Sequence, residues 1–223
     1  MSRITVLTLG SRGDVQPYVA LGKGLQAAGH DVTIATAKDF AQFVCQNGLQ
    51  YTPISDEMRK LTEDPEAAKA MVGGGNKLKL MKMVMPMLRK MLDESWRAAQ
   101  GADAILYHPK ILGGLDIGER LGIPAILAFA LPGMTPTSTM ANPLLTTRNL
   151  GGWLNRLSYQ AMLFALTAPY RKMINRWRTE TLGVSSSKSV RLVTPTTPSL
   201  YAYSQHVVPR PTDWPTTTLV TGY

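Results

Sequence analysis

Among the acidic and histidine side chains of this 223-residue sequence, two stand out for acid–base chemistry because each follows an apolar run typical of a buried strand. Asp14 lies in a glycine-containing stretch after residues 4–9, and His108 directly follows residues 103–107. A carboxylate can act as a general base when burial moves its pKa toward neutrality, and a histidine can assist it. Plainer roles also fit, because aspartates often cap helices and a histidine before a proline often forms a hydrogen bond within its loop.

The elements around these two residues indicate one α/β domain. After the apolar run at 4–9, a 3.6-residue periodicity predicts a helix with Pro17 in its first turn, and residues 31–35 form a second apolar run. Further strands are predicted at 49–54, 103–107, 124–129 and 200–203, and further helices at 41–47, 77–100, 111–121 and 153–182. We therefore predict a Rossmann-like, mostly parallel sheet flanked by helices, with Asp14 and His108 projecting from the same edge.

The stretch after the first strand does not match a nucleotide-binding loop. The dinucleotide fingerprint needs Gly-x-Gly-x-x-Gly and an acid near the end of the second strand. Here only Gly10 and Gly13 are present, three positions apart, and residues 36–38 contain no acid. No Gly-x-x-x-x-Gly-Lys-Ser/Thr loop occurs either. A nucleotide-dependent oxidoreductase is therefore disfavoured, and the two glycines are expected to allow unusual backbone angles and the close approach of a ligand.

Composition and charge restrict the setting and the partners. With 44% hydrophobic and 17% charged residues, the chain is long enough for one substantial core and short for two. The single cysteine, Cys45, and the lack of a recognisable signal peptide favour a reducing, cytoplasmic location. The net charge of +9 favours a phosphate-bearing donor or peripheral contact with an anionic membrane, or is simply a basic surface. No nucleic acid is expected, because no aromatic platform accompanies the basic residues, and no metal-ligand spacing is present.

Residues 77–100 form an amphipathic pattern rich in methionine. Met81 and Met85 fall on its apolar face, and basic residues collect on the opposite side: Lys79, Lys82, Arg89 and Lys90. The apolar face could belong to the core, line a site for a flat hydrophobic molecule, or lie on a membrane. Pro86 interrupts the pattern and predicts a kink, or two helices that meet there.

Two long loops and a later helical region complete the pattern. Residues 55–76 include three consecutive glycines and predict a loop around a short helix, suited to a lid or recognition segment. Residues 131–143 are rich in proline and threonine and follow the fifth strand, so they are expected to form a binding loop. The large apolar side chains of residues 153–182 are predicted to be core contacts: Trp153, Leu157, Phe164 and Trp177.

Residues 10–17 read Gly-Ser-Arg-Gly-Asp-Val-Gln-Pro, and the same pattern continues to residue 25. This stretch and several others resemble the amino-terminal half of UDP-dependent glycosyltransferases of the two-domain GT-B type. The others lie at residues 29–33, 103–110, 214–215 and 220–223, so that the resemblance spans nearly the whole chain. The sequence is most similar to the sterol glucosyltransferase-like branch, which is close to the antibiotic glycosyltransferases.

The resemblance implies the acceptor-binding half of an inverting glycosyltransferase that is inactive alone. Residues 1–210 would form the acceptor domain, and residues 211–223 the linker and the start of a missing carboxyl-terminal domain that holds most of a UDP-sugar. The implied acceptor is a hydroxyl of a hydrophobic molecule such as a sterol, lipid or polyketide, with no cofactor beyond the donor substrate. A non-catalytic α/β module that binds a hydrophobic ligand, a membrane surface or a partner domain is the alternative.

The same resemblance implies roles for individual residues. Asp14 is the implied base and His108 its assistant, with the two residue types exchanged relative to plant and drug-metabolising relatives. Acceptor contacts are expected from the first loop, the methionine face and the loop after the fifth strand, namely from Ser11, Arg12, Gly13, Met81, Met85, Pro132 and Met134.

Overall fold

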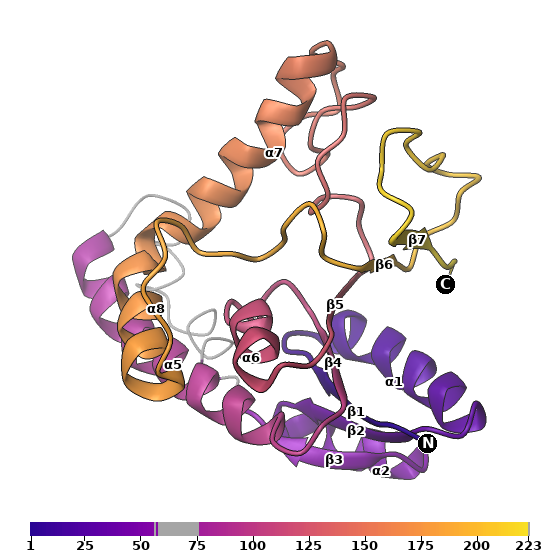
Figure 1. Cartoon of the computed structure of the whole chain (residues 1–223), viewed down its shortest axis with the longest axis vertical. Helices are drawn as coiled ribbons and strands as arrows, with labels where there is room; N and C mark the ends of the chain where they lie inside the picture. Colours follow the sequence, from indigo (N-terminus) through magenta and orange to yellow (C-terminus); the bar gives the residue numbers. More distant parts are fainter. Residues whose placement is uncertain (56, 58–75, 223) are drawn as a thin grey trace.

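Seven strands form one parallel sheet at the centre of the molecule (Figure 1). The structure, a computed structural model, describes residues 1–55, 57 and 76–222. The strand order is β3-β2-β1-β4-β5-β6-β7, and every neighbouring pair is parallel. The strands are β1 (Arg3–Leu7), β2 (Asp31–Thr36), β3 (Gln50–Pro53), β4 (Ala104–Tyr107), β5 (Ala125–Phe129), β6 (Ser199–Tyr201) and β7 (Thr218–Val220). The predicted parallel α/β fold is confirmed, and the neighbours β1 and β4 form the switch point where such sheets bind ligands.

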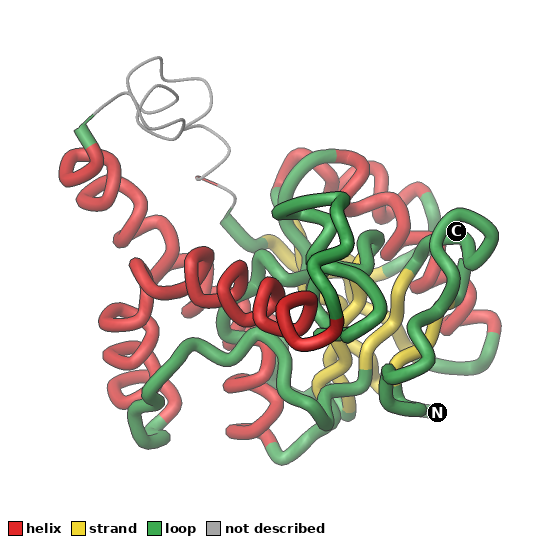
Figure 2. Tube along the Cα trace, turned by 90° about the horizontal axis from the view of Figure 1, so that it is seen from above, coloured by secondary structure: helices red, strands yellow, loops and turns green. Residues whose placement is uncertain are grey.

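Helices lie on both sides of the strands (Figure 2). The α-helices are α1 (Arg12–Ala27), α2 (Ala41–Gln46), α5 (Lys77–Ala98), α6 (Gly114–Leu121), α7 (Gly152–Thr167) and α8 (Arg171–Trp177). Short turns η1 (Lys38–Phe40) and η2 (Ala168–Tyr170) precede α2 and α8, and the π-helical η3 (Arg178–Leu182) ends at Gly183. Gly183 has a φ of +64°, the left-handed conformation expected of a residue that closes a helix. No described helix is both long and apolar enough to cross a bilayer.

The first helix begins earlier than the sequence pattern predicts. α1 starts at Arg12, so Pro17 lies inside it rather than in its first turn, and Asp14 lies in that turn rather than in a loop. The Ser11 amide donates to the Asp14 carboxylate over 2.7 Å, a bond that stabilises a helix start at this point. Gly13 is therefore an ordinary helical residue.

The methionine-rich pattern forms one continuous helix, so the two-helix interpretation at Pro86 is wrong. Pro86 lies on the exposed side of α5, whereas Leu88 and Leu92 are fully buried against the sheet. Because the second half of the apolar face packs into the core and Pro86 faces solvent, the amide that proline lacks does not divide the helix. Of the three interpretations of this face, core packing describes its second half. The predicted loop at 55–76 lies mostly outside the described residues.

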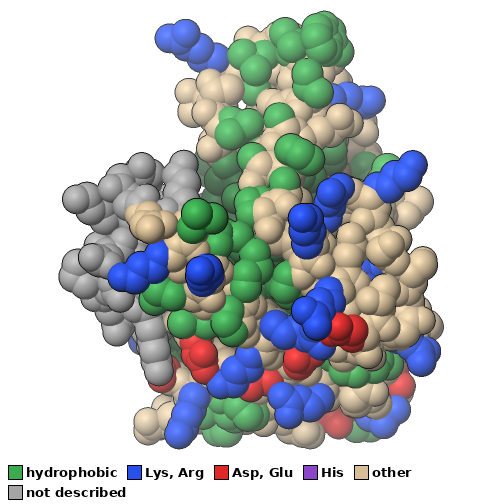
Figure 3. All heavy atoms as spheres, turned by 90° about the vertical axis from the view of Figure 1, so that its left-hand side faces the viewer, with side chains coloured by type: hydrophobic (Ala, Val, Ile, Leu, Met, Phe, Trp, Pro, Cys, Tyr) green, Lys and Arg blue, Asp and Glu red, His purple; other side chains and the backbone are tan. Residues whose placement is uncertain are grey.

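α7 leaves large apolar side chains in solvent, contrary to the prediction from sequence. Trp153 is 72% exposed, Phe164 70% and Leu157 45%, whereas Trp177 of α8 is buried as predicted. Figure 3 shows hydrophobic side chains gathered on the upper part of the molecule, where α7 lies. The physical reason is that α7 docks through a face of mixed character. Asn155 and Ser158 are buried on it beside Tyr159 and Met162, and the Asn155 amide donates to the Ser138 carbonyl over 2.8 Å.

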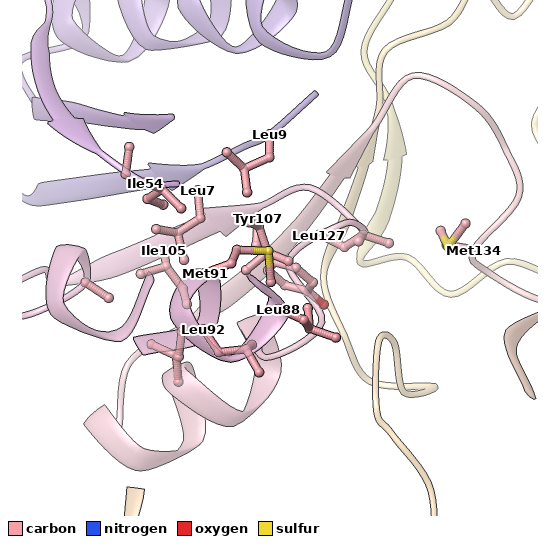
Figure 4. Close-up of a cluster of buried hydrophobic side chains, with 14 of the residues drawn as sticks. Leu7, Leu9, Ile54, Leu88, Met91, Leu92, Ile105, Tyr107, Leu127 and Met134 are labelled. Atoms are coloured by element: carbon pink, nitrogen blue, oxygen red, sulfur yellow. The ribbon is translucent and has the colours of Figure 1, made fainter. Parts of the chain in front are cut away.

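Alternate residues of the central strands point to opposite faces of the sheet, and both faces are buried. From β4, Ile105 and Tyr107 join Leu88 and Leu92 of α5 in one cluster, part of which is shown in Figure 4. Leu106 points the other way, into a second cluster with residues of α1 and α2. Burial on both faces explains why the strands read as continuous apolar runs.

Residues near the carboxyl end pack against this domain. β7 pairs with β6, and Trp214 is 4% exposed and stacks on Tyr201 with ring centroids 4.9 Å apart. Asp213 accepts hydrogen bonds from the Ser138 amide over 2.7 Å and from Arg156 over 2.9 Å. The segment expected to be a linker therefore contributes the last strand of this sheet. A further domain beyond it stays a prediction.

Candidate functional site

The structure brings Asp14 and His108 together at the carboxyl ends of β1 and β4. Leu7 of β1 lies opposite Tyr107 of β4, and the next amide, that of His108, donates to the Leu7 carbonyl over 2.9 Å. Asp14 reaches the same point because α1 starts here, with the Thr8 hydroxyl donating to the Asp14 carbonyl over 2.7 Å. Nε2 of His108 lies 3.4 Å from Oδ1 of Asp14.

Both ring nitrogens of His108 are committed to neighbours. The Lys110 amide donates to Nδ1 over 3.0 Å, so the imidazole proton lies on Nε2, which faces Asp14. The ring is 3% exposed and contacts Phe129 edge-on, with centroids 5.2 Å apart and planes at 87°. Burial, reinforced by the Lys110 charge, lowers the pKa of His108 despite the hydrogen bond to Asp14. The imidazole is therefore neutral near pH 7 and has no free lone pair with which to accept a substrate proton.

Asp14 is an ionised carboxylate that several neighbours hold and that stays partly exposed. Its Oδ2 accepts from the Ser11 amide over 2.7 Å, from the Ser11 hydroxyl over 3.0 Å and from Lys110 Nζ over 2.8 Å. Its side chain is 22% exposed. Burial raises the pKa of Asp14, but the bonds from His108, Lys110 and Ser11 outweigh burial and hold that pKa well below its usual range. The shift toward neutrality that a general base was expected to need is therefore not present.

The capping role and the position facing His108 coexist in the same carboxylate. The Ser11 amide bond caps α1, while Oδ1 points toward the imidazole. The amino end of α1 also favours a negative charge at this place. The arrangement can hold an anion steadily at the sheet edge and can receive a proton there from a bound hydroxyl.

Lys110 is a member of this site that the sequence patterns did not single out. Its ammonium is about half exposed and pairs with Asp14. Gly10 makes room for the pair: its φ is +128°, and a Cβ at this position would overlap both the Asp14 carboxylate and the Lys110 ammonium. The sequence could have indicated this residue, because Lys110 follows His108 by two positions in the same predicted loop.

The first-loop residues expected to contact an acceptor lie at or near Asp14. Ser11 bonds to Asp14 directly, and the helical Gly13 precedes it at the start of α1. Arg12 turns toward α2, where its guanidinium lies 5.1 Å from the centroid of the Phe43 ring.

The other predicted acceptor residues belong to α5 and to the loop after β5. Met81 and Met85 are half-buried on α5, and Pro132 and Met134 are buried, with Met134 in the main core (Figure 4). Their contact with an acceptor stays a prediction. In the described part of the chain, no three His, Cys, Asp or Glu side chains are placed to hold a metal ion.

Comparison of the sequence with known proteins gives matches to one family of glycosyltransferases. Residues 4–140 match the glycosyltransferase family 28 N-terminal domain. The chain is 36% identical over 226 residues to a sterol 3-beta-glucosyltransferase of Debaryomyces hansenii, covering 98% of this chain and 14% of that protein. It is 35% identical to the UDP-sugar-dependent glycosyltransferase 52 of Dictyostelium discoideum, covering 99% of this chain and 13% of that protein. The chain thus spans about one seventh of the length of these relatives.

A solved structure shows the same fold at low sequence identity. The crystal structure of the kitacinnamycin glycosyltransferase superposes with a TM-score of 0.61 at 20% identity, covering 94% of this chain and 48% of that one. The seven-stranded parallel sheet with its flanking helices matches the amino-terminal half of that two-domain architecture.

Proposed function

The chain belongs to the family of the glycosyltransferase family 28 N-terminal domain, and from this premise we propose that it is the acceptor-binding half of an inverting glycosyltransferase. The complete enzyme would transfer a sugar from a UDP-sugar to a hydroxyl of a hydrophobic acceptor. Similarity to a sterol 3-beta-glucosyltransferase supports a sterol-like acceptor, and similarity to a UDP-sugar-dependent relative supports the donor. A second domain would supply most donor contacts, so this half would be inactive alone.

Asp14 is the proposed base. The acceptor oxygen attacks the anomeric carbon of the donor, the bond from that carbon to the diphosphate breaks, UDP leaves, and Asp14 takes the hydroxyl proton. A carboxylate of low pKa suits a late proton transfer, because the hydroxyl becomes strongly acidic only as its oxygen bonds to the anomeric carbon. A single displacement at that carbon inverts its configuration.

His108 is the proposed positioning residue for that base. Its Nε2–H faces Asp14 Oδ1, and its Nδ1 is occupied by the Lys110 amide, so the ring can orient the carboxylate but cannot replace it. Lys110 keeps the carboxylate ionised between turnovers. One observation carries the proposal. Both imidazole nitrogens of His108 already have partners, whereas the neighbouring Asp14 carboxylate at the sheet edge is partly exposed.

Because the proposed acceptor is hydrophobic, we also propose that the protein works in the cytoplasm in peripheral contact with a membrane. This contact would bring the acceptor within reach without requiring it to cross water.

The test compares three variants in the complete enzyme. Asp14→Asn removes the base and is expected to lower kcat about 10²–10⁴-fold. His108→Gln keeps an N–H donor near the position of Nε2 and is expected to lower kcat by about tenfold or less. Asp31→Asn is the matched control, because Asp31 is a carboxylate at the opposite edge of the sheet that accepts a bond from Gln50 over 2.7 Å.

The affinity for the donor shows whether each variant is still folded, independently of its effect on kcat. The Kd for UDP-sugar, measured by calorimetry, should stay nearly unchanged in all three variants. If His108→Gln loses as much kcat as Asp14→Asn, the histidine is the base and the assignment is reversed. If Asp14→Asn keeps near-native kcat, Asp14 only caps α1.

A further inference from the structure

α7 carries an apolar stripe that no part of the described chain covers. The stripe consists of residues three or four positions apart that share one side of the helix, namely Leu150 just before it and Trp153, Leu157, Ala161 and Phe164 within it. Trp153 and Phe164 are the most exposed of them, at 72% and 70%. Isolated exposed apolar residues are ordinary, but a continuous stripe with two aromatic side chains indicates a surface that meets an apolar phase.

The stretch of sequence that contains this stripe carries charge of one sign. Residues 120–179 contain no aspartate or glutamate, but they contain seven basic residues: Arg120, Arg148, Arg156, Arg171, Lys172, Arg176 and Arg178. Figure 3 shows Lys and Arg side chains at the margins of the upper apolar area, whereas Asp and Glu gather on the lower part of that face.

Several of the basic residues have no acidic partner. Arg156 pairs with Asp213 from outside the stretch, and Arg176 and Arg178 pair with acids on other segments. Arg148 before α7 and Lys172 after it have no carboxylate partner among residues 1–55, 57 and 76–222. Free positive charge therefore lies at both ends of the stripe.

α5 was also a candidate membrane surface from the sequence, but it is less suited to that role. Two of its basic residues are neutralised: Arg89 pairs with Asp93 over 3.1 Å and with Glu180 over 2.9 Å, and Lys90 pairs with Glu57 over 2.5 Å. The second half of its apolar face is in the core. Of the two helices, α7 carries the stripe with two aromatic side chains that are at least 70% exposed, and it has unpaired positive charge near both ends.

We propose that the α7 stripe is a docking surface for an anionic lipid bilayer. Trp153, Leu157 and Phe164 would enter the boundary between headgroups and acyl chains, and Arg148 and Lys172 would contact lipid phosphates. A second copy of this chain fits less well, because pairing two such faces would bring acid-free basic segments together. The inference concerns lipid binding only and does not depend on which residue is the base at the sheet edge.

The experiment is sedimentation of the chain with phosphatidylcholine vesicles that contain or lack phosphatidylserine, at low and high salt. Binding should require phosphatidylserine and should weaken as salt rises. The double variant Trp153→Ala, Phe164→Ala should lose at least about tenfold in vesicle affinity. Each of Arg148→Gln and Lys172→Gln should lose about fivefold.

Two variants control for the loss of an exposed apolar side chain. Leu78→Ala acts on α5 and Val207→Ala on the loop after β6, at positions that are 77% and 72% exposed. Both should bind vesicles like the native chain, and circular dichroism should show that all variants are folded. No binding of the native chain at low salt, undiminished binding of the double variant, or an equal loss in Leu78→Ala would overturn the proposal.

Tryptophan fluorescence gives a second readout on the same samples. Vesicles should shift Trp153 emission to shorter wavelength, and brominated lipids should quench it. Trp153→Phe should bind nearly as well but lose most of the shift, because Trp177 and Trp214 are already buried and Trp96 is half-buried on α5. Vesicle binding without any Trp153 signal would contradict insertion of the stripe. A native dimer that the double variant dissociates, without vesicle binding, would assign the stripe to self-association instead.

Discussion

Replacing Asp116 of α6 by asparagine should destabilise the domain severely. Asp116 is 1% exposed and accepts a hydrogen bond from Arg178, which is 5% exposed, and another from Arg191 over 2.8 Å. Burial and the Arg191 charge lower the pKa of Arg178, but an arginine still stays protonated. Asp116→Asn would therefore leave a buried guanidinium without a counter-charge and next to a second cation.

The cost follows from that geometry. Removing one partner of a buried ion pair costs about 3–5 kcal/mol, whereas an exposed pair is worth about 0–1 kcal/mol. For a chain of this length, the larger cost corresponds to a fall in Tm of roughly 6–20 °C. Glu119→Gln is the matched control, because Glu119 pairs with the same Arg191 but is 51% exposed.

Urea unfolding followed by circular dichroism measures both free energies. Asp116→Asn should lose about 3–5 kcal/mol of unfolding free energy and Glu119→Gln about 1 kcal/mol or less. The double variant Asp116→Leu, Arg178→Met should recover most of the loss, because it removes both buried charges. If the free energy of unfolding of Asp116→Asn lies within about 1 kcal/mol of that of Glu119→Gln, the buried ion pair is effectively solvated and the reasoning fails.

Two further predictions concern Asp14 and its surroundings. Gly10→Ala should cost about 1–3 kcal/mol and displace the Asp14 carboxylate, because φ is +128° and the Cβ meets that group. The helical Gly24→Ala, whose Cβ meets nothing within 4 Å, should instead stabilise by up to about 1 kcal/mol; equal thermal shifts in the two variants would contradict this. The pKa of Asp14 is lower in the folded state than its value of about 3.9 in the unfolded chain, so Asp14 stabilises the fold above that pH and less as the pH falls below it. The Tm difference between the native chain and Asp14→Asn should be largest above about pH 5 and shrink below about pH 4, and a difference independent of pH would refute the assigned pKa direction.

The strands and most helices could be predicted because their signals are local. Adjacent residues form the apolar run at 4–9 that predicts the first strand, and the structure has β1 at Arg3–Leu7. In the same way, a glycine at position 183 predicts the end of a helix, and Gly183 has the left-handed conformation there. The start of α1 was missed because Ser11 and Asp14 exchange a capping bond that outweighs the Pro17 signal. The exposed side of α7 was missed because buried polar contacts, such as that of Asn155, decide which face docks.

The sequence by itself determined that Asp14 and His108 share an edge, because parallel strands place their carboxyl ends together. Only the tertiary structure decided how they interact there. The ammonium that pairs with Asp14 comes from Lys110, 96 positions away, and the Lys110 amide selects which imidazole nitrogen faces the carboxylate. The physical reason is that periodicity reports the conformation of adjacent residues, whereas protonation state, burial and partner choice depend on atoms that meet only after the sheet has formed.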